Sequence, residues 1–454
     1  MKKIEQIISE AIIGTEFENK TYIVGGYVRD KIMGIQNQDM DIVVENKNGG
    51  EGLACLLYRK NISTRPVIYE NFGTASVMID DHKIEFVMSR KESYRDKDRK
   101  PEVQLGTLRD DIFRRDFTIN SLVMNIISGE IKDLSGKGIS DIKNRIIRST
   151  SDPEVIFGED PLRMLRAIRF SVKSGFEIES ETEKGIRNNS PKLKHISWER
   201  RRDELIKMLK SDEPVWAINL LYDYDLMRNL IPEFEKLRNL QQGKCHNLDA
   251  FDHSLSVLEL TEPNLELRLS ALLHDIGKPE VVSEDESGIH FYKHDKVGSD
   301  IAGKILKRLK FSSSQIVKVK FLISNHMRLK SFGKNGELVS DKAIRKLIYQ
   351  SGDNLEILLK LIHADNQVHA ENYKMPNQIP EIRKRITKIR KVSNTKKLPL
   401  NGKDIMDRFK IESGKKVGEF LSEASEIWFE HPDWEKERIL DEIEKETKST
   451  KFRC

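Results

Sequence analysis

The fold of the N-terminal part is decided by the stretch Tyr22-Ile23-Val24-Gly25-Gly26-Tyr27-Val28-Arg29-Asp30 and by Gln38-Asp39-Met40-Asp41-Ile42-Val43-Val44 shortly after it. Side chains two residues apart on a strand point to the same face, so Asp39 and Asp41 converge on one point that suits a pair of divalent cations. The Gly25-Gly26 turn lets backbone N–H groups approach a phosphate closely, at the expected start of a helix. Together these features are the minimal equipment for nucleotidyl transfer.

Length and composition limit the class of protein. A chain of 454 residues predicts about two to four domains. Charged residues make up 33% of the chain, and the apolar runs fall short of a membrane span, so we expect no membrane partner and no signal peptide. The 3 cysteines are far apart and form neither a disulfide framework nor a zinc pattern, which favours a reducing, cytoplasmic location. The net charge of +5 is a weak indication of a polyanionic partner.

Hydrophobic periodicity separates a sheet region from a helical region. It predicts a helix at residues 4–13 and strands at 21–24, 41–45, 66–69, 74–79 and 83–88. After Asp160 it predicts helices almost throughout, at 161–174, 199–210, 214–224, 252–262, 265–274, 297–310 and 340–351. We therefore expect an α+β fold, in which a mixed sheet with helices is followed by an all-α part.

Arginines near the two aspartates offer contacts to phosphate. Arg29 lies one turn into the expected helix, where it can hold triphosphate oxygens bidentately or pair with Asp30 on the surface. A second segment places two arginines and an aspartate beside an apolar stretch, Arg114-Arg115-Asp116-Phe117-Thr118-Ile119-Asn120-Ser121-Leu122. These charged residues either hold phosphate and ribose or form a buried ion-pair network.

A base-reading pair is predicted at the start of the helix at 161–174. Asp160 precedes Pro161, which makes a sound helix N-terminus, and it shares a face with Arg163. A carboxylate acceptor beside guanidinium donors can pair with cytosine and adenine, which present N–H donors beside a ring-nitrogen acceptor. Uracil and guanine present the reverse order and are rejected. Arg166 extends the basic stripe and can orient Arg163 or meet phosphate.

These segments resemble the class II tRNA nucleotidyltransferase (CCA-adding enzyme) and bacterial poly(A) polymerase family. The resemblance rests on five motifs in the family's order, Gly25-Gly26-Tyr27-Val28-Arg29-Asp30, Asp39-Met40-Asp41, Arg114–Asn120, Glu159-Asp160-Pro161-Leu162-Arg163 and Ile196-Ser197-Trp198-Glu199-Arg200. It implies a polymerase-β-like palm followed by a helical neck, body and tail, with Mg²⁺ held by Asp39 and Asp41. The nucleotide-binding residues that we expect are Gly25, Gly26, Arg29, Arg114, Arg115, Asp116, Asn120, Asp160, Arg163 and Arg166.

Two further features bear on the reaction. Glu85, on the strand expected at 83–88, is our candidate for a third catalytic carboxylate, although a solvent-facing strand residue is nearly as good an interpretation. The charged connection from Arg90 to Asp110 stands where the family has a flexible loop that supports the switch from C to A addition. Its presence argues for A addition.

Histidines gather in the later part of the chain, with 8 of the 11 between residues 246 and 369. The segments with His253, His274-Asp275, His294, His326 and Asp365 resemble the HD phosphohydrolase superfamily. The resemblance implies four metal ligands, namely His253, His274, Asp275 and Asp365. It implies that His294 and His326 are the extra histidines of variants that hold two metals or bind phosphate, and that Lys278 contacts phosphate. Nitrogen and oxygen ligands suit Mn²⁺, Fe²⁺, Ni²⁺ or Mg²⁺. We interpret His246 as a surface residue.

The expected domains are a nucleotidyltransferase palm at 1–145, a helical neck and RNA-binding body at 146–240, an HD domain at 241–375 and a helical tail at 376–454. The resemblance implies tRNA, ATP and CTP as partners. The basic run Lys384–Lys391 either follows an RNA backbone or is a solvated helix face. A homodimer is compatible with the sequence, which leaves the oligomeric state open.

The activity that we expect is addition of CCA, or of its terminal A, to tRNA 3′ ends by attack of the RNA 3′-OH on the α-phosphate. The HD domain is expected to be a metal-dependent phosphodiesterase or phosphatase for RNA 3′ ends or nucleotides. Three alternatives stay open: a poly(A) polymerase, an HD nucleotide hydrolase with a nucleotide-sensing N-terminal module, and an inactive RNA-binding protein. The last requires two complete metal constellations to be accidental.

Overall fold

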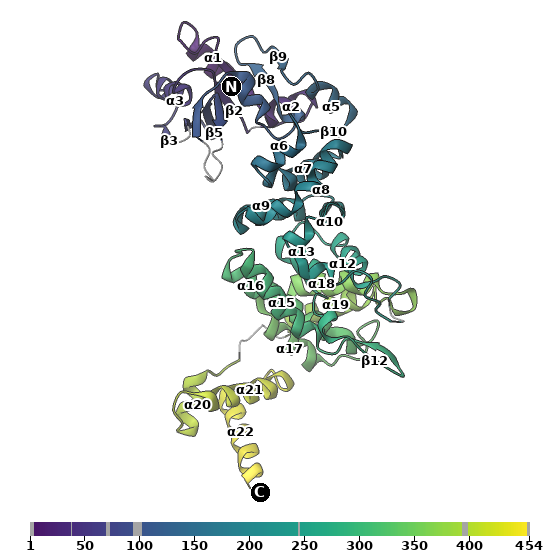
Figure 1. The fold of residues 1–454 in the computed structure, drawn as a ribbon. Helices are drawn as coiled ribbons and strands as arrows, with labels where there is room; N and C mark the ends of the chain where they lie inside the picture. The colour runs from purple at the N-terminus through teal and green to yellow at the C-terminus, as the bar shows by residue number, and fades with distance from the viewer. Residues whose placement is uncertain are drawn as a thin grey trace. The chain divides into compact units, whose positions relative to one another are not determined.

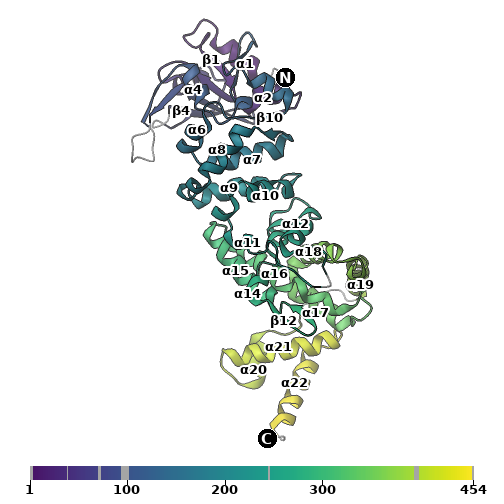
Figure 2. The same cartoon turned by 45° about the vertical axis from the view of Figure 1, so that its right-hand side comes forward.

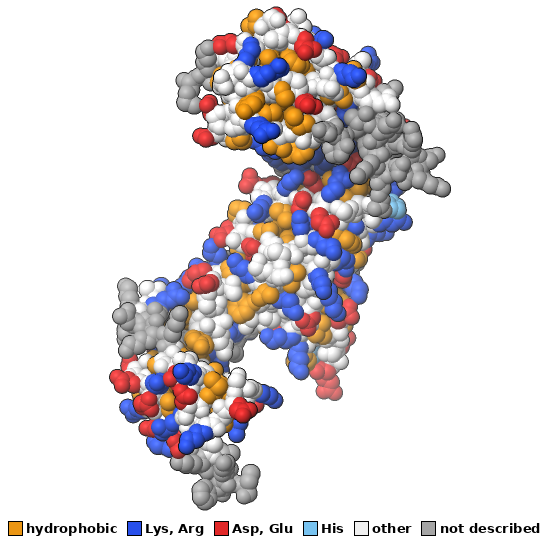
Figure 3. All heavy atoms as spheres, turned by 90° about the vertical axis from the view of Figure 1, so that its left-hand side faces the viewer, with side chains coloured by type: hydrophobic (Ala, Val, Ile, Leu, Met, Phe, Trp, Pro, Cys, Tyr) orange, Lys and Arg blue, Asp and Glu red, His pale blue; other side chains and the backbone are white. Residues whose placement is uncertain are grey.

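The computed structural model describes residues 4–37, 39–69, 73–93, 102–243, 246–392 and 398–451. The chain divides into two compact units, Met1–Glu235 and Lys236–Cys454 (Figure 1). Basic and acidic side chains are interspersed over the face drawn in Figure 3, as expected for a chain with 33% charged residues. Within the described residues, no helix combines the length and the apolar character needed to cross a membrane.

The first unit begins with a mixed seven-stranded sheet. Its strand order is β3-β4-β5-β2-β1-β8-β9. The bounds are Thr21–Val24 for β1, Asp41–Val44 for β2, Val67–Tyr69 for β3, Thr74–Ile79 for β4, His82–Met88 for β5, Leu122–Asn125 for β8 and Ile131–Asp133 for β9. β2 runs parallel to β5 and antiparallel to β1. All residues of β1 are buried, because the strand lies between β2 and β8 inside the sheet. Its β-branched and aromatic side chains suit this buried position.

One face of this sheet carries the features that will form a site. Tyr22, Val24 and Val43 pack in one apolar cluster with Leu108 and Ile112 of α4 (Leu108–Phe113). Because strand side chains alternate, Asp41 points to the same face as Val43. Helix α3 (Gly49–Arg59) packs against β2, β4 and β5, and helix α2 (Gly26–Ile32) follows β1 directly.

The rest of the first unit is mainly helical (Figure 2), with one short parallel strand pair formed by β10 (Ile146–Ile147) and β11 (Glu177–Ile178). The bounds of the helices are Gly138–Asn144 for α5, Pro153–Glu159 for α6, Leu162–Ser174 for α7, Ser180–Asn189 for α8, Trp198–Leu209 for α9, Pro214–Asp223 for α10 and Pro232–Glu235 for α11. Helix α7 packs against both α9 and α10. Its apolar residues recur at helical spacing, and Leu165, Ala167 and Ile168 are fully buried.

The second unit is a helical bundle followed by a tail. The bundle contains α12 (Ala250–Glu259), α13 (Leu265–Leu273), α15 (His294–Arg308), α16 (Ser313–Asn325), α17 (Asp341–Ser351), α18 (Leu355–Val368) and α19 (Gln378–Val392). α13 contacts α12, α16 and α18, and every residue of α13 except Glu266 is buried. The tail helices are α20 (Gly402–Phe409), α21 (Lys415–Glu430) and α22 (Lys436–Lys451), and they share their own apolar cluster.

The tail is joined to the bundle through α17 and α21. Lys342 pairs with Glu430 at 2.9 Å, and Arg345 donates to the carbonyl oxygen of Phe429 at 2.8 Å. Tyr349 of α17 packs edge-on against Phe429, with ring centroids 5.4 Å apart. Apolar and charged contacts therefore both hold α21 against α17.

The predicted α+β class and the order of its parts are confirmed. The interpretation of residues 90–110 as a plain charged connection needs correction. Arg90–Ser93 (β6) and Glu102–Leu105 (β7) pair as an antiparallel hairpin, and α4 begins at Leu108. Residues 90–93 are all charged or polar, so their sequence shows no alternation, and the alternating segment 102–105 is only four residues long. The expected flexible segment within this stretch, residues 94–101, lies outside the described residues.

Candidate functional site

The predicted carboxylates meet at one end of the sheet. Asp41 is the first residue of β2 and stands in register with Glu85 of the neighbouring parallel strand β5. Asp39 lies just before β2, and its backbone N–H donates to Asn37. Asp39, Asp41 and Glu85 all line a cavity of 560 Å³. Parallel register explains this meeting, because residues in one row share a face.

The charges at this end of the sheet are suited to a divalent cation. Burial, together with the carboxylates of Glu85 and Asp39, raises the pKa of Asp41, and the guanidinium of Arg115 only partly opposes this. Repulsion among carboxylates is relieved when a hard cation binds their oxygens. The carboxylates therefore suit a divalent cation. Mg²⁺ as that cation and a catalytic role for Glu85 stay predictions, and Lys83 also pairs with Glu85 at 2.6 Å.

Gly25 is required by its conformation and by its neighbours. Its φ is +73° and its ψ is −138°, a region that is essentially reserved for glycine. A Cβ built on Gly25 would lie 3.3 Å from a guanidinium nitrogen of Arg115 and 3.9 Å from a carboxylate oxygen of Asp41. Gly25 and Gly26 both line the cavity, so their backbone is open to a ligand.

Arg29 is held by its neighbours and is not a loose surface residue. It is 5% exposed, and it donates to Asp30 at 2.7 Å and to Asn120 at 2.8 Å. Asn120 in turn donates to the buried carboxylate of Asp116 at 3.1 Å. Arg29 and Asn120 line the cavity, whereas Asp116 lies behind them. The alternative of a surface pair between Arg29 and Asp30 is wrong, since both are buried.

Two aspartates orient the remaining arginines. Asp111 accepts from Arg114 at 2.6 Å and from Arg115 at 3.0 Å. Burial opposes ionisation of Asp111, but the two guanidinium groups hold its pKa below the usual value. Asp116 accepts from both Nε and an Nη atom of Arg166, at 2.8 and 2.6 Å. Arg115 and Arg166 also line the cavity. The same arginines therefore take part in ion pairs with aspartates and face the space where a ligand could bind.

The predicted base-reading residues are engaged with other groups. Asp160 accepts from the N–H of Leu162 at 3.1 Å and pairs with Arg200 at 2.9 Å. Arg163 donates to the carbonyl oxygen of Arg114 at 2.6 Å and to that of Ile156 at 3.1 Å. The helix begins at Leu162, one residue later than the prediction. The pairing of Asp160 and Arg163 with a base stays a prediction.

The sequence analysis missed a basic extension of this cavity. Arg169, Phe170 and Lys173 of α7 and Lys207 of α9 also line it. Arg169 lies over the Phe170 ring at 4.1 Å and pairs with the buried Glu204 at 2.6 Å. Arg169 and Lys173 follow Arg166 at helical spacings of three and seven, which would have placed them on the same face.

The predicted HD residues converge at a second site, in the bundle. His253 comes from α12, His274 and Asp275 follow α13, and Asp365 comes from α18. His253 Nε2 lies 3.1 Å from Asp365 Oδ1, and His274 Nε2 lies 3.1 Å from Asp275 Oδ2. All four side chains are buried, and their ligand atoms fall into groups that could hold a metal ion.

The extra histidines face the other oxygen of Asp275. His294 Nε2 and His326 Nε2 lie 3.3 and 3.8 Å from Asp275 Oδ1, and 3.2 Å from each other. Asp275 Oδ2 faces His274 and lies 3.7 Å from His253 Nε2. The Asp275 carboxylate therefore stands between two groups of nitrogen ligands, as a bridging ligand would.

Backbone carbonyls fix the orientation of three of these rings. The Nδ1 atoms of His274, His294 and His326 lie 2.8, 2.8 and 2.7 Å from the carbonyl oxygens of the residues three positions earlier. A carbonyl oxygen only accepts, so each Nδ1 carries the proton and each Nε2 presents a lone pair. Among the described residues, the buried Nε2 of His274 has no hydrogen-bond partner, which suits an atom that binds a metal ion.

The protonation states of His253, His326 and Asp365 also fit a cation, whereas at His274 burial is outweighed by Asp275 and Asp365, which raise the pKa of the imidazole. Burial lowers the pKa of His253 to about 4 and that of His326 to about 3, so both are neutral near pH 7. Burial alone would raise the pKa of Asp365, but Lys330 and His253 hold this pKa well below its usual value. Neutral imidazoles and ionised carboxylates are the forms that bind divalent metals.

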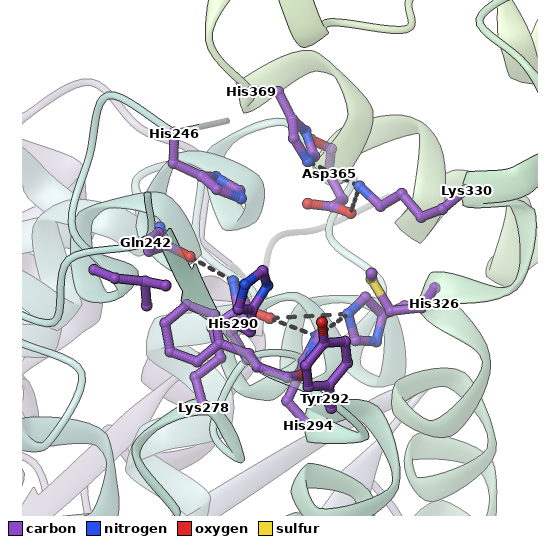
Figure 4. Close-up of a pocket in the computed structure, with 14 residues that line it drawn as sticks. Gln242, His246, Lys278, His290, Tyr292, His294, His326, Lys330, Asp365 and His369 are labelled. Carbon is purple, nitrogen blue, oxygen red and sulfur yellow. Dashed lines mark hydrogen bonds and ion pairs between the residues drawn. The ribbon is translucent and has the colours of Figure 1, made fainter. Parts of the chain in front are cut away.

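Beside the ligands lies a cavity of 230 Å³ (Figure 4). Lys278 lines it and contacts both Asp275 Oδ2, at 2.6 Å, and Gln242. The sequence analysis missed further lining residues, namely Gln242, His290, Tyr292, Lys330 and His369. His369 follows Asp365 by one helical turn, a spacing that could have revealed it.

The interpretation of His246 as a surface residue is wrong. His246 lines the same cavity, and its ring centroid lies 4.7 Å from that of His253 and 4.7 Å from that of His369. Burial lowers its pKa to about 2. No local spacing links residue 246 to the HD residues, so the sequence offered no signal for this contact.

Fold and sites together define a nucleotidyltransferase palm joined to an HD metal domain, and the comparisons agree. The poly A polymerase head domain matches residues 21–148, the probable RNA and SrmB-binding site of polymerase A matches 175–237, and the HD domain matches 250–358. The chain belongs to the class II CCA-adding enzyme and poly(A) polymerase family.

Individual relatives extend over most of the chain. It is 29% identical over 424 residues to an A-adding tRNA nucleotidyltransferase of Deinococcus radiodurans, covering 89% of this chain and 90% of the relative. It is 28% identical over 443 residues to a CCA-adding enzyme of Ligilactobacillus salivarius, covering 96% and 95%. The fold is similar to the crystal structure of the Bacillus stearothermophilus CCA-adding enzyme in complex with CTP, with a TM-score of 0.71, 22% identity and 100% of both chains covered.

Proposed function

We propose that this chain adds CCA, or its terminal A, to the 3′ ends of tRNA from CTP and ATP. The observation that carries the proposal is the row of Asp41 and Glu85 on parallel strands, beside Asp39 and the Gly25 turn, in one cavity. Family membership supports the reaction class, and the Deinococcus and Ligilactobacillus relatives carry those two activities in their names. A cytosolic location follows from these substrates.

The residues of the cavity can carry the transfer. Asp39 and Asp41 would hold Mg²⁺, which supplies charge for activating the RNA 3′-OH and for stabilising the pyrophosphate that leaves. Arg29, Arg115 and Arg166 would neutralise triphosphate oxygens, and the aspartates behind them keep the guanidinium groups in place. The 3′ oxygen forms a bond to the α-phosphorus as the bond to pyrophosphate breaks.

Base choice is proposed to depend on Asp160 and Arg163. In the structure, Asp160 pairs with Arg200 and Arg163 donates to the carbonyl oxygen of Arg114. Reading a base therefore requires these side chains to exchange those partners for the base edge. An Arg200→Ala variant would remove one competitor for Asp160 and should change the ratio of C to A incorporation.

A direct test uses three tRNA transcripts that end before CCA, after C and after CC. Each is incubated with Mg²⁺ and CTP, ATP or both, and products are separated at nucleotide resolution. Growth of the shortest transcript by C, C and A, followed by arrest, identifies full CCA addition. Extension of only the CC-ended transcript by one A identifies A addition. Long A tails on any RNA identify a poly(A) polymerase, and no extension at all refutes the proposal.

For the second site we propose metal-dependent hydrolysis of phosphoesters on nucleotides or RNA 3′ ends. The specific observation is the buried cluster in which Asp275 stands between two groups of histidines, with Lys278 against the same carboxylate. Mn²⁺, Fe²⁺, Ni²⁺ or Mg²⁺ would be held there and would supply a water nucleophile near neutral pH. Hydrolysis would join a water oxygen to phosphorus, break the bond between phosphorus and the ester oxygen, and pass a proton from the water to the leaving ester oxygen.

The two activities fit one task, because a 3′ end blocked by a cyclic phosphate cannot be extended until a hydroxyl is freed. The test compares Asp275→Ala with Asp41→Ala in the full chain. Asp275→Ala should abolish hydrolysis of adenosine 2′,3′-cyclic phosphate and retain extension of tRNA, whereas Asp41→Ala should do the reverse. Unchanged hydrolysis in Asp275→Ala would refute the role of the HD site.

A further inference from the structure

We propose that the cavity beside the HD cluster recognises a nucleoside phosphate, with Lys330 as a phosphate contact and Tyr292 as a stacking platform for the base. The proposal rests on the proposed hydrolase function and names its substrate contacts. Lys330 belongs to the turn of helix η5 (His326–Phe332), and Tyr292 lies between strand β13 (Gly288–His290) and α15. Figure 4 shows both beside the metal-ligand residues.

The charge of the cavity favours an anion once metal is bound. Its acidic and basic lining residues are Asp275, Asp365, Lys278 and Lys330, two negative and two positive. Their formal charges cancel, so each divalent cation adds two unbalanced positive charges. A buried surplus of this kind is costly unless an anion enters, and a phosphate ester carries the matching charge.

Lys330 is the lysine that can meet the ligand. Its Nζ lies 3.1 Å from Asp365 Oδ2 and 2.8 Å from His369 Nε2, and its side chain is 25% exposed. The side chain of Lys278 is 6% exposed and is enclosed by Asp275, Gln242 and the Phe291 ring. Asp365 Oδ1 faces His253, so Lys330 uses the outer oxygen and stands at the edge of the metal site.

Tyr292 provides a flat apolar surface at the rim. It is 69% exposed, and its ring is stacked on His290 with centroids 5.2 Å apart and 13° between the planes. His290 Nε2 is held by Ser287 at 2.7 Å and by Asp285 at 3.0 Å, so the ring beneath Tyr292 is fixed. Exposed aromatic rings held in this way stack on nucleobases with little regard to sequence.

The size of the cavity indicates which part of the ligand would meet Lys330 and which part would meet Tyr292. A volume of 230 Å³ is smaller than the roughly 300–1,000 Å³ of typical small-molecule sites. It can take a phosphate and part of a sugar, and the base is left at the rim where Tyr292 lies. A mononucleotide and the last nucleotide of an RNA share this chemistry.

The test uses the full-length protein loaded with Mn²⁺ and two secondary phosphomonoesters, adenosine 2′-monophosphate and glycerol 2-phosphate, with phosphate release as the readout. Tyr292→Ala should raise the KM for the nucleotide by roughly 5- to 100-fold and leave glycerol 2-phosphate unchanged. Lys330→Met should raise the KM for both by about 10-fold or more, and Lys330→Arg should restore it. Tyr373→Ala and Lys360→Met are the controls, because both residues are surface residues outside the cavity lining.

Calorimetry separates recognition from catalysis. Binding of adenosine 2′-monophosphate should weaken in Tyr292→Ala and Lys330→Met, while Mn²⁺ binding by Tyr292→Ala stays within about 2-fold of the parent. Normal nucleotide KM and binding in Tyr292→Ala would overturn the inference even with hydrolysis intact. Absence of hydrolysis by the parent, with nucleotide binding still dependent on Tyr292, would refute the hydrolase function and retain the inference. The same comparison with an RNA that ends in a 2′,3′-cyclic phosphate identifies the substrate. If Tyr292→Ala and Lys330→Met also weaken hydrolysis of this RNA, the substrate is an RNA end. If they weaken only the hydrolysis of mononucleotides, the substrate is a free nucleotide.

Discussion

Replacing Gly25 by alanine should damage the nucleotide site far more than the fold. The backbone conformation at Gly25, φ +73° and ψ −138°, would cost an alanine about 1–3 kcal/mol. For a unit of this size, a change of 1 kcal/mol corresponds to about 2–4 °C in Tm. The new Cβ would also lie 3.3 Å from the Arg115 guanidinium and 3.9 Å from the Asp41 carboxylate. Relief of the first contact requires a shift of a few tenths of an ångström in Arg115, the residue that we propose binds the triphosphate.

The loss of activity follows from that shift. Reacting groups misplaced by about 1 Å can cost roughly 100-fold, so a smaller shift, together with the methyl group in the phosphate path, should lower kcat/KM by at least about 10-fold. Gly14→Ala is the matched control, because Gly14 has the same φ of +73° and nothing within 4 Å of the position of its Cβ. It should lose stability by about 1–2 kcal/mol and keep activity within about 2-fold of the parent.

The assay is single-nucleotide incorporation on CC-ended and unextended tRNA, at a temperature well below the Tm of both variants. Tm values from thermal unfolding establish that the two proteins are folded and comparably destabilised. Equal activity of Gly25→Ala and Gly14→Ala would refute the reasoning, because both substitutions place a Cβ on a glycine with φ of +73°, and only the one at Gly25 meets Arg115 and Asp41.

Three further substitutions test other parts of the structure. Asp41→Asn should abolish nucleotide incorporation. In Mg²⁺-free buffer at pH 7 it should leave Tm equal or higher, because a carboxyl whose pKa is raised on folding costs stability while it is ionised. A clear fall in Tm would contradict the repulsion among the carboxylates. Asp111→Asn should lower stability by about 2 kcal/mol at pH 7, because it breaks the pairs with Arg114 and Arg115. A pKa lowered on folding stabilises above the unfolded value, so the difference should shrink as pH falls below about 4 and a pH-independent gap would refute the ion-pair account. Asp275→Asn should lose Mn²⁺ binding, measured by calorimetry, with tRNA extension retained; unchanged Mn²⁺ binding would exclude Asp275 as a ligand.

Local patterns predicted the sheet well. Strands β1, β2, β4 and β5 begin or end within one residue of the predictions, because each has a buried apolar run bounded by turn residues. The strand β9 was missed because Ile131-Lys132-Asp133 is too short to show alternation. The apolar residues of β8 were noticed beside the arginine segment but were not assigned to a strand.

Contacts between distant segments decided what the sequence could not show. The sequence left open whether Glu85 is a catalytic carboxylate or a solvent-facing strand residue. The register of β2 and β5 places Glu85 beside Asp41, which favours the hypothesis of a catalytic carboxylate. Arg29 was expected to face either phosphate or Asp30. It does pair with Asp30, but it also donates to Asn120, which lies 91 residues away, and only tertiary packing brings these two together. The same holds for Lys330 and Asp365, which come from different helices.

Register pairing between β2 and β5 also has an evolutionary consequence. The separation of Asp41 and Glu85 is set by the backbone hydrogen bonds of two adjacent strands, and the chain between them passes through α3, β3 and β4. Insertions or deletions in the connections of this excursion need not move either carboxylate. A slip of one residue between β2 and β5, in contrast, would turn Glu85 to the opposite face. Relatives can therefore drift widely in the length of this segment while alignment of the two strands stays under strict selection.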